Sequence, residues 1–135
     1  MTTKLIPTRA LVGGGMFLLA LLLYIDRVCI SVAKEPIAGS LDLNDKQMGW
    51  VLSVFALGYA LCQVPAGSMS DRYGPRKVLA SIVSFWSLLT AFTGAAFSYG
   101  SLLIIRLLFG AGEAGAFPGM SRAVFSWFPL RERGL

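Results

Sequence analysis

Residues 101–121 read SLLIIRLLFGAGEAGAFPGMS, and this stretch decides the class of fold. Its residues are apolar or small except for one arginine, Arg106, and one glutamate, Glu113. At a rise of about 1.5 Å per residue, a helix of this length crosses the roughly 30 Å of hydrocarbon in a bilayer. The stretch therefore predicts a transmembrane helix.

Three similar stretches precede it, at about residues 11–31, 48–69 and 78–97. Hydrophobic residues make up 56% of the 135-residue chain and charged residues only 14%, about half of their share in an average soluble domain. Before the second stretch, Asn44 and Gln47 have the spacing of a capping box, which predicts that a helix begins there. The sequence therefore predicts an all-α multi-pass membrane protein with four transmembrane helices.

The segments between the spans differ in charge, and this difference predicts the orientation. The N-terminal arm (residues 1–10), the connector between the second and third spans and the tail (residues 122–135) carry eight basic and two acidic side chains. The connector between the first two spans carries two basic and three acidic ones. By the positive-inside rule, the arm and the tail lie in the cytoplasm, at a cell (plasma or inner) membrane. A cleaved secretory signal is disfavoured, because Asp26 and Arg27 interrupt the first span just before the candidate cleavage site.

Several classes of function are excluded. The chain has no histidine, so histidine-based nucleophile activation, histidine metal sites and a histidine proton relay are ruled out. The net charge of +5 reflects topology and indicates no nucleic-acid partner. Residues 110–115, GAGEAG, match the dinucleotide pattern GxGxxG, but they lie within an apolar span instead of between a strand and a helix. We expect no cofactor, no metal and no enzymatic activity, and we expect these small residues to allow close helix packing.

Four charged residues, Asp26, Arg27, Arg106 and Glu113, lie inside the predicted spans. Each costs about 2.5–3.5 kcal/mol at the centre of a span unless it is paired, and their charges sum to zero. Similar depth in the membrane predicts that Asp26 pairs with Arg106 and that Arg27 faces the same cavity. Arginine binds a carboxylate through two parallel hydrogen bonds, and a carboxyl group in a low-dielectric setting can take up and release a proton. The residues thus predict an anion site beside a proton site; ion pairs that only set helix register are the alternative.

Two polar residues of the second span are further candidates. Tyr59 and Gln63 are four residues apart, so they share one face of a helix. They are expected either to line the same cavity or to form hydrogen bonds between helices.

The connector GSMSDRYGPRK, residues 67–77, resembles the signature loop between helices 2 and 3 of the major facilitator superfamily. Pro75 stands where a basic residue is common in that signature. An acidic group at a helix end can dock on the N-terminus of a neighbouring helix, and basic residues can pair across a cytoplasmic gate. A merely solvated positive loop is the alternative. The matching residues are Gly67, Asp71, Arg72, Gly74, Arg76 and Lys77.

Further stretches are similar to the anion:cation symporter family of that superfamily, which includes bacterial galactonate, glucarate and hexuronate transporters. They are YIDR (24–27), GYALCQVPAG (58–67), and the region from Arg106 to residue 134 with FPGMSR (117–122) and SWFPLRERG (126–134). The resemblance covers nearly the whole chain and implies proton-coupled uptake of a small organic anion such as a sugar acid. The implied proton carriers are Asp26 and Glu113, the residues near the substrate carboxylate are Arg27 and Arg106, and the cavity lining includes Tyr59 and Gln63.

Members of the superfamily have twelve spans in two halves, each built from three-helix repeats. The resemblance implies that this chain holds the first four spans, that a fifth helix is missing after residue 135, and that the chain does not transport alone. Its partners would be the bilayer and the missing C-terminal part of the transporter. Two alternatives remain: a complete four-helix carrier that works as a dimer, which a stable symmetric dimer in detergent would favour, and a non-transporting membrane scaffold.

Overall fold

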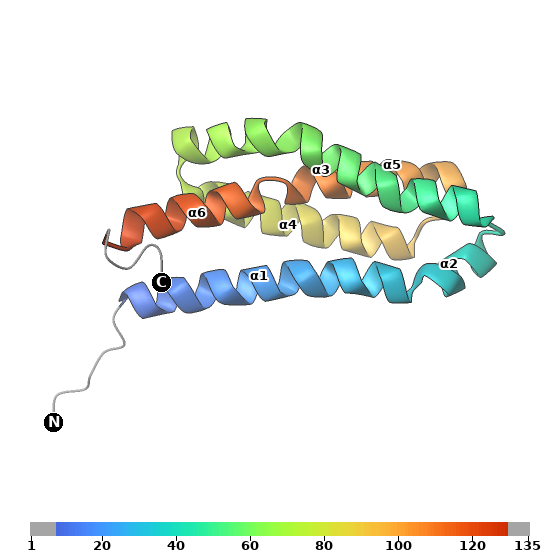
Figure 1. The fold of residues 1–135 in the computed structure, drawn as a ribbon, viewed down its shortest axis with the longest axis horizontal. Helices are drawn as coiled ribbons and strands as arrows, with labels where there is room; N and C mark the ends of the chain where they lie inside the picture. The colour runs from blue at the N-terminus through green and yellow to red at the C-terminus, as the bar shows by residue number, and fades with distance from the viewer. Residues whose placement is uncertain (1–7, 130–135) are drawn as a thin grey trace, which may run out of the picture.

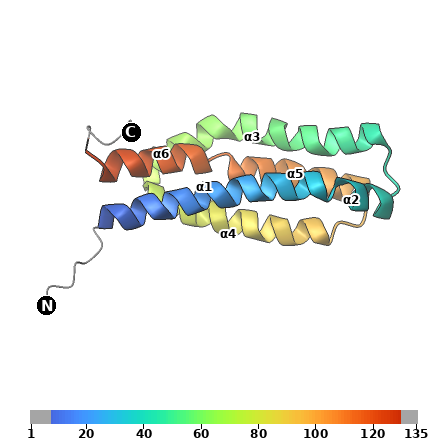
Figure 2. The same ribbon diagram turned by 60° about the horizontal axis from the view of Figure 1, so that its bottom comes forward.

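A computed structural model describes residues 8–129 of the chain. These residues form a bundle of helices and contain no strand (Figure 1). The helices run along the same long axis, except for the short α2, which lies at one end (Figures 1 and 2). In chain order they are α1 (Thr8–Val32), α2 (Lys34–Ser40), α3 (Asp45–Tyr73), α4 (Pro75–Gly94), α5 (Tyr99–Glu113) and α6 (Ala116–Trp127).

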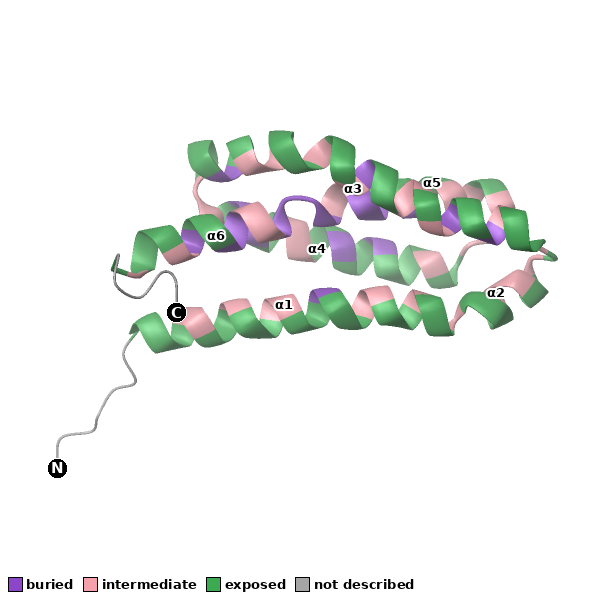
Figure 3. Ribbon diagram, in the orientation of Figure 1, coloured by how far each residue is buried: buried purple, intermediate pink, exposed green. Residues whose placement is uncertain are grey.

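Four segments are long and apolar enough to cross a membrane, as the sequence predicts. They are Thr8–Val32, Asp45–Tyr73, Pro75–Gly94 and Tyr99–Trp127, the last combining α5 and α6. All four carry large apolar side chains that are exposed, among them Phe17 at 69% and Val64 at 80%. Exposed residues follow the outer sides of the helices in Figure 3. Such outward apolar surface suits contact with lipid. The all-α membrane fold is thereby confirmed; residues 1–7 and 130–135 of the expected arm and tail lie outside the described residues.

The connector between the first two spans contains a helix that the sequence did not predict. In α2, Ile37 packs with Leu41 and Leu43 against a small core of Met48, Val51 and Leu102 at this end of the bundle. Ile37 and Leu41, which directly follows α2, are four residues apart and so share one face, and the helix forms because both pack against this core. The predicted capping box at the start of α3 is confirmed: Gln47 N–H donates to the Asn44 side chain at 2.9 Å, and Asn44 N–H donates to the Gln47 side chain at 3.0 Å.

The fourth span is interrupted at Ala114–Gly115, where one continuous helix was expected over residues 101–121. The physical reason is Pro118, which has no N–H to donate to the Ala114 carbonyl and whose ring crowds that carbonyl. The chain continues as α6 to Trp127, beyond the expected end of the span. The interruption comes directly after Glu113, the last residue of α5.

The closest helix approach joins α3 to α5 through two glycines. A Cβ built on Gly110 would lie 2.1 Å from the carbonyl oxygen of Phe55, and one on Gly58 would lie 2.3 Å from the carbonyl oxygen of Leu107. Both distances are far below any real contact, so the two backbones meet only because neither residue has a side chain. The close packing expected from the small residues of the GAGEAG stretch is confirmed at Gly110.

Gly110→Ala is expected to destabilise the bundle by at least about 1–3 kcal/mol, because the added methyl group must push α3 and α5 apart. The measurement is thermal unfolding in detergent, followed by circular dichroism. Gly100→Ala is the matched control on the same helix, where a Cβ would meet nothing within 4 Å. Equal stability of the two variants would contradict the close approach of the two helices.

Candidate functional site

Three of the four intramembrane charges line one pocket between α1, α3 and α5. This pocket of about 240 Å³ is bordered by Asp26, Arg27 and Arg106, together with apolar side chains such as Phe55 and Phe109. Glu113 lies directly behind it, bonded to Arg27. The predicted gathering of the four charges in one place is therefore seen, although the pairing between them differs from the prediction.

Arg27 pairs with Glu113. The guanidinium donates from Nε to Oε1 at 3.4 Å and from Nη2 to Oε2 at 3.3 Å, which is the two-bonded arrangement that arginine forms with carboxylates. Glu113 is fully buried, whereas 34% of the Arg27 side chain is exposed. The pair thus joins a fully buried carboxylate on α5 to a partly exposed guanidinium that lines the pocket.

Two aromatic rings lie against the guanidinium group of Arg27. Its guanidinium carbon lies 5.0 Å from the centre of the Tyr59 ring and 5.5 Å from that of Phe55, both on α3. Rings at this distance stabilise a cation through their negative faces. Tyr59 therefore contacts Arg27 beside the pocket, although it is not among the residues that line the pocket. Gln63 lies one turn further on, is exposed, and borders neither the pocket nor the Arg27–Glu113 pair.

Arg106 is a buried cation, 6% exposed, and no carboxylate among residues 8–129 forms a hydrogen bond with it. Its Nη2 donates to the Thr93 hydroxyl at 3.4 Å, and its guanidinium lies 5.0 Å from the centre of the Phe109 ring. The Nε of Arg106 is buried and makes no hydrogen bond within the described chain. A buried donor left in this state costs free energy, so Arg106 is ready to receive an anionic acceptor.

Asp26 is bonded to Trp86 instead of to Arg106. The indole Nε1–H of Trp86 donates to Oδ2 of Asp26. Asp26 and Arg106 both line the pocket described above and a second pocket of about 350 Å³ between α1, α2, α4 and α5. They nevertheless form no ion pair with each other, so the predicted Asp26–Arg106 pair is wrong. Similar depth was a correct guide to proximity, but the rotation of α1 turns Asp26 toward α4.

Sequence reasoning missed Trp86 and Thr93, both on α4, because the predicted span over residues 78–97 has no charged residue. They are seven residues apart, about two helical turns, and therefore lie on one face of α4. That spacing equals the one between Arg106 and Glu113 on α5. This shared spacing was the only feature of the sequence that could have pointed to Trp86 and Thr93, because both residue types are common in membrane spans.

Trp86→Phe is expected to destabilise the bundle by about 1.5–3 kcal/mol, because it removes a hydrogen bond to a charged group while keeping an aromatic ring. The measurement is unfolding in detergent, combined with Asp26→Asn in a double-mutant cycle. Trp50→Phe is the matched control, because Trp50 is 63% exposed. Additive effects of Trp86→Phe and Asp26→Asn would show that the two side chains are not coupled.

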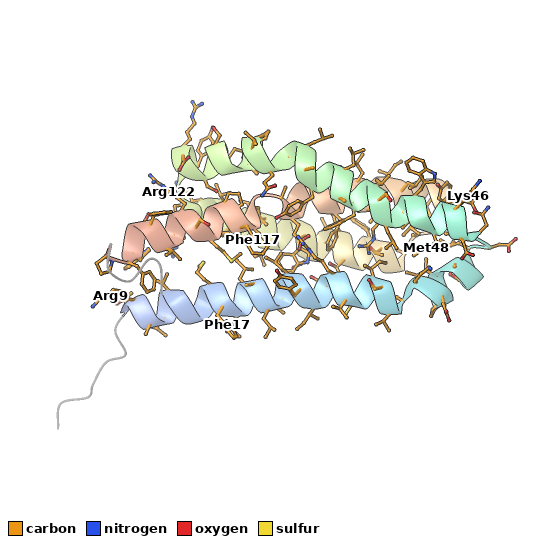
Figure 4. All side chains as sticks on the ribbon, in the orientation of Figure 1. Arg9, Phe17, Lys46, Met48, Phe117 and Arg122 are labelled. Atoms are coloured by element: carbon orange, nitrogen blue, oxygen red, sulfur yellow. The ribbon has the colours of Figure 1, made fainter. Side chains whose placement is uncertain are left out.

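The signature loop lies at the end of the bundle opposite α2. Figure 4 labels Arg122 near this end and Lys46 at the other. Arg122 Nε lies 3.2 Å from Asp71 Oδ1, so α6 is tied to the end of α3. Asp71 was expected to dock on the N-terminus of a neighbouring helix; its partner is a side chain within α6 instead. Because both side chains are more than half exposed, this pair contributes little stability.

Gly74 makes the turn between α3 and α4. Its φ of +86° is a conformation that residues with a side chain rarely adopt. The next residue, Pro75, is the first of α4, a position where a missing N–H costs nothing. Among the remaining signature residues, Gly67 leaves room for Pro118, whose Cβ would be 3.4 Å from an added Cβ, and Arg72, Arg76 and Lys77 are exposed.

Comparison with known proteins gives consistent matches. The family model described as Major Facilitator Superfamily matches residues 16–135. The chain is 43% identical over 129 residues to the probable sulfoacetate transporter SauU of Cupriavidus necator, covering 96% of this chain and 30% of that protein. It is 35% identical over 137 residues to the probable galactarate/D-glucarate transporter GarP of Escherichia coli K12, covering 97% and 31%. It is 39% identical over 118 residues to the hexuronate transporter of Bacillus subtilis, covering 87% and 28%. The chain thus spans about three tenths of the length of these relatives.

Proposed function

Because this chain belongs to the major facilitator superfamily, we propose that it forms the first four spans of a secondary transporter that moves an organic anion together with a proton. The relatives named above carry the names of organic-acid transporters. Their names support the class of substrate, and the charged pocket supports the mode of binding.

The observation that carries the proposal is Arg106, a buried arginine whose Nε is without a hydrogen bond, beside Arg27 in one pocket. A carboxylate in this pocket would accept a hydrogen bond from Nε of Arg106 and could accept further ones from the guanidinium of Arg27. Two arginines inside a membrane cost free energy, and a bound anion would offset that cost. Each would bind the substrate carboxylate through charge-assisted hydrogen bonds.

We propose that proton and anion transport are coupled because Glu113 and the substrate carboxylate compete for Arg27. While Glu113 is ionised, it occupies the fork of Arg27 with two hydrogen bonds. When Glu113 is protonated it loses its charge, so Arg27 becomes free to bind a substrate carboxylate. Release of the proton would restore the Arg27–Glu113 pair and expel the anion. Asp26, next to Arg27 on α1, is the second candidate proton carrier.

For the orientation, we propose that the start of α1 and the end of α6 face the cytoplasm together with the signature loop. The excess of basic residues in those segments supports this orientation.

Tyr59 would border the cavity and hold Arg27 in place. We propose that Asp71, Arg72, Gly74, Arg76 and Lys77, with Gly67, serve a cytoplasmic gate. The rest of the transporter would supply the opposite wall of the cavity. The family match and the arginine pair favour this reading over a dimeric four-helix carrier or a scaffold.

Arg106→Gln tests the proposal in a full-length transporter that carries these residues. We expect affinity for the anion to fall about tenfold, because glutamine offers a neutral amide where a charged donor stood. The measurement is uptake of sulfoacetate, galactarate and a hexuronate into proteoliposomes, driven by an imposed pH gradient in the absence of sodium.

Lys46→Gln is the control, because it removes a cation that is exposed and lies outside both the charged pocket and the signature loop. It should leave affinity unchanged. Uptake that needs a sodium gradient would contradict proton coupling, and unchanged affinity in Arg106→Gln would remove Arg106 from the anion site.

A further inference from the structure

A groove of about 460 Å³ lies between α3, α4 and α5, and it shares no lining residue with the pocket of Arg27 and Arg106. Its walls come from small and apolar residues, among them Ala66, Met69, Ile82 and Ala111. Met69 at its edge is 51% exposed and Phe85 is 44% exposed, so the groove opens to the surface of the bundle. The groove is thus an apolar recess on a face that a bilayer would surround.

The end of the groove at the signature loop is positively charged. Lys77 lines it and is exposed, and Arg76 beside it is exposed too. α4 begins here at Pro75, and no side chain caps its N-terminus. The free N–H groups and the dipole of a helix N-terminus attract anions such as phosphate. The nearby Asp71 does not cancel this charge, because it is paired with Arg122.

The length of the groove matches one leaflet of a bilayer. On α4 it extends from Lys77 to Phe85, eight residues or about 12 Å. Half of the hydrocarbon thickness is about 15 Å. A ligand that fits must therefore carry negative charge at the end of the span and an apolar chain that runs toward the middle of the membrane.

We propose that this groove binds an anionic phospholipid, with its phosphate against Lys77 and the N-terminus of α4 and an acyl chain along α3 and α4. The site is independent of transport: it rests only on the chain lying in a bilayer. Anionic lipids concentrate in the cytoplasmic leaflet, which is where the proposed orientation puts the signature loop.

The test uses the 135-residue chain in phosphatidylcholine vesicles that contain a small fraction of phosphatidylglycerol with a photoreactive group in its acyl chain. After illumination, peptide mass spectrometry maps the labelled residues. We expect label on Met69, Ser81 and Phe85, and about fivefold less label with a photoreactive phosphatidylcholine. Symmetric vesicles present the lipid on both sides, so the result does not depend on orientation or on transport.

Two pairs of variants separate the headgroup from the chain. Lys77→Gln should reduce phosphatidylglycerol labelling of the groove about fivefold, while Lys46→Gln, at the other end of the bundle, should not. Ser81→Phe should fill the groove and remove the label for both lipids, while Ser87→Phe on the same helix should keep it, because Ser87 does not line the groove.

Three results would overturn the proposal. Equal labelling by the two lipids would show that the groove takes any lipid. An equal loss of phosphatidylglycerol label in Lys77→Gln and Lys46→Gln would show that the net charge of the chain, and not Lys77 itself, attracts the lipid. Absence of lipid label from Met69, Ser81 and Phe85, while exposed apolar residues elsewhere such as Phe17 are labelled, would show that the groove does not hold a lipid.

Discussion

Glu113→Gln in a full-length transporter with these residues is expected to abolish accumulation of the anion while counterflow exchange continues. Glutamine keeps the shape of a protonated glutamate but cannot release a proton, so it holds the site in one stage of the cycle. Arg27 then never regains its carboxylate partner and stays available to the substrate. Exchange needs only binding and reorientation, whereas accumulation needs the proton to leave.

The measurement compares two assays on the same proteoliposomes. One follows exchange of labelled anion across the membrane without a gradient, and the other follows uptake driven by a pH gradient. Glu35→Gln on the exposed α2 is the matched control and should behave like the unmodified protein. If Glu113→Gln still accumulates the anion, Glu113 is not the coupling residue and Asp26 must carry the proton alone.

Arg27→Ala is expected to impair exchange and uptake together, with substrate affinity reduced at least about tenfold. The variant removes a charge-assisted contact to the substrate, which contributes about 1.5–3 kcal/mol. It also leaves the carboxylate of Glu113, which is fully buried, without its two-bonded partner. Breaking a buried pair in this way costs about 3–5 kcal/mol, and the low end applies because Arg27 is 34% exposed.

The double variant Arg27→Ala/Glu113→Gln separates these two effects. It should recover most of the lost stability in unfolding experiments, because no charge stays buried without a partner, but it should recover no affinity. Arg27→Lys should restore affinity only in part, since an ammonium group is a point charge that lacks the planar fork. Substrate binding that survives in Arg27→Ala would show that the Arg27–Glu113 pair serves only to hold α1 against α5.

Much of the fold follows from local properties of the sequence. The length of each apolar run sets the number of spans, because a fixed hydrocarbon thickness requires a fixed number of helical residues. Asn44 and Gln47 mark the start of α3 through bonds between neighbours in sequence. Gly110 reveals close packing, because small residues at helical spacing have few other uses in a span. The four charges mark the candidate site because an unpaired charge is costly in a membrane.

Other features depend on contacts between segments and could not be deduced. α2 forms because Ile37 finds a small core at the end of the bundle, although its segment looks like a loop. The break after Glu113 needs the geometry of Pro118 within a packed helix; Pro65 lies inside α3 without breaking it. A proline in the sequence therefore does not by itself say where a helix is interrupted.

Sequence patterns are enough to predict a four-span membrane protein in which Asp26, Arg27 and Arg106 lie at similar depth, with Glu113 two helical turns from Arg106. Which of them pair depends on the packing of the helices: Arg27 binds Glu113, Asp26 binds Trp86, and Nε of Arg106 makes no hydrogen bond within residues 8–129. The reason is geometric. Counting residues gives the position of a side chain along a helix axis, but the direction in which it points depends on how each helix is rotated against its neighbours. That rotation is set by contacts such as Gly58 and Gly110 between α3 and α5, which no single span contains.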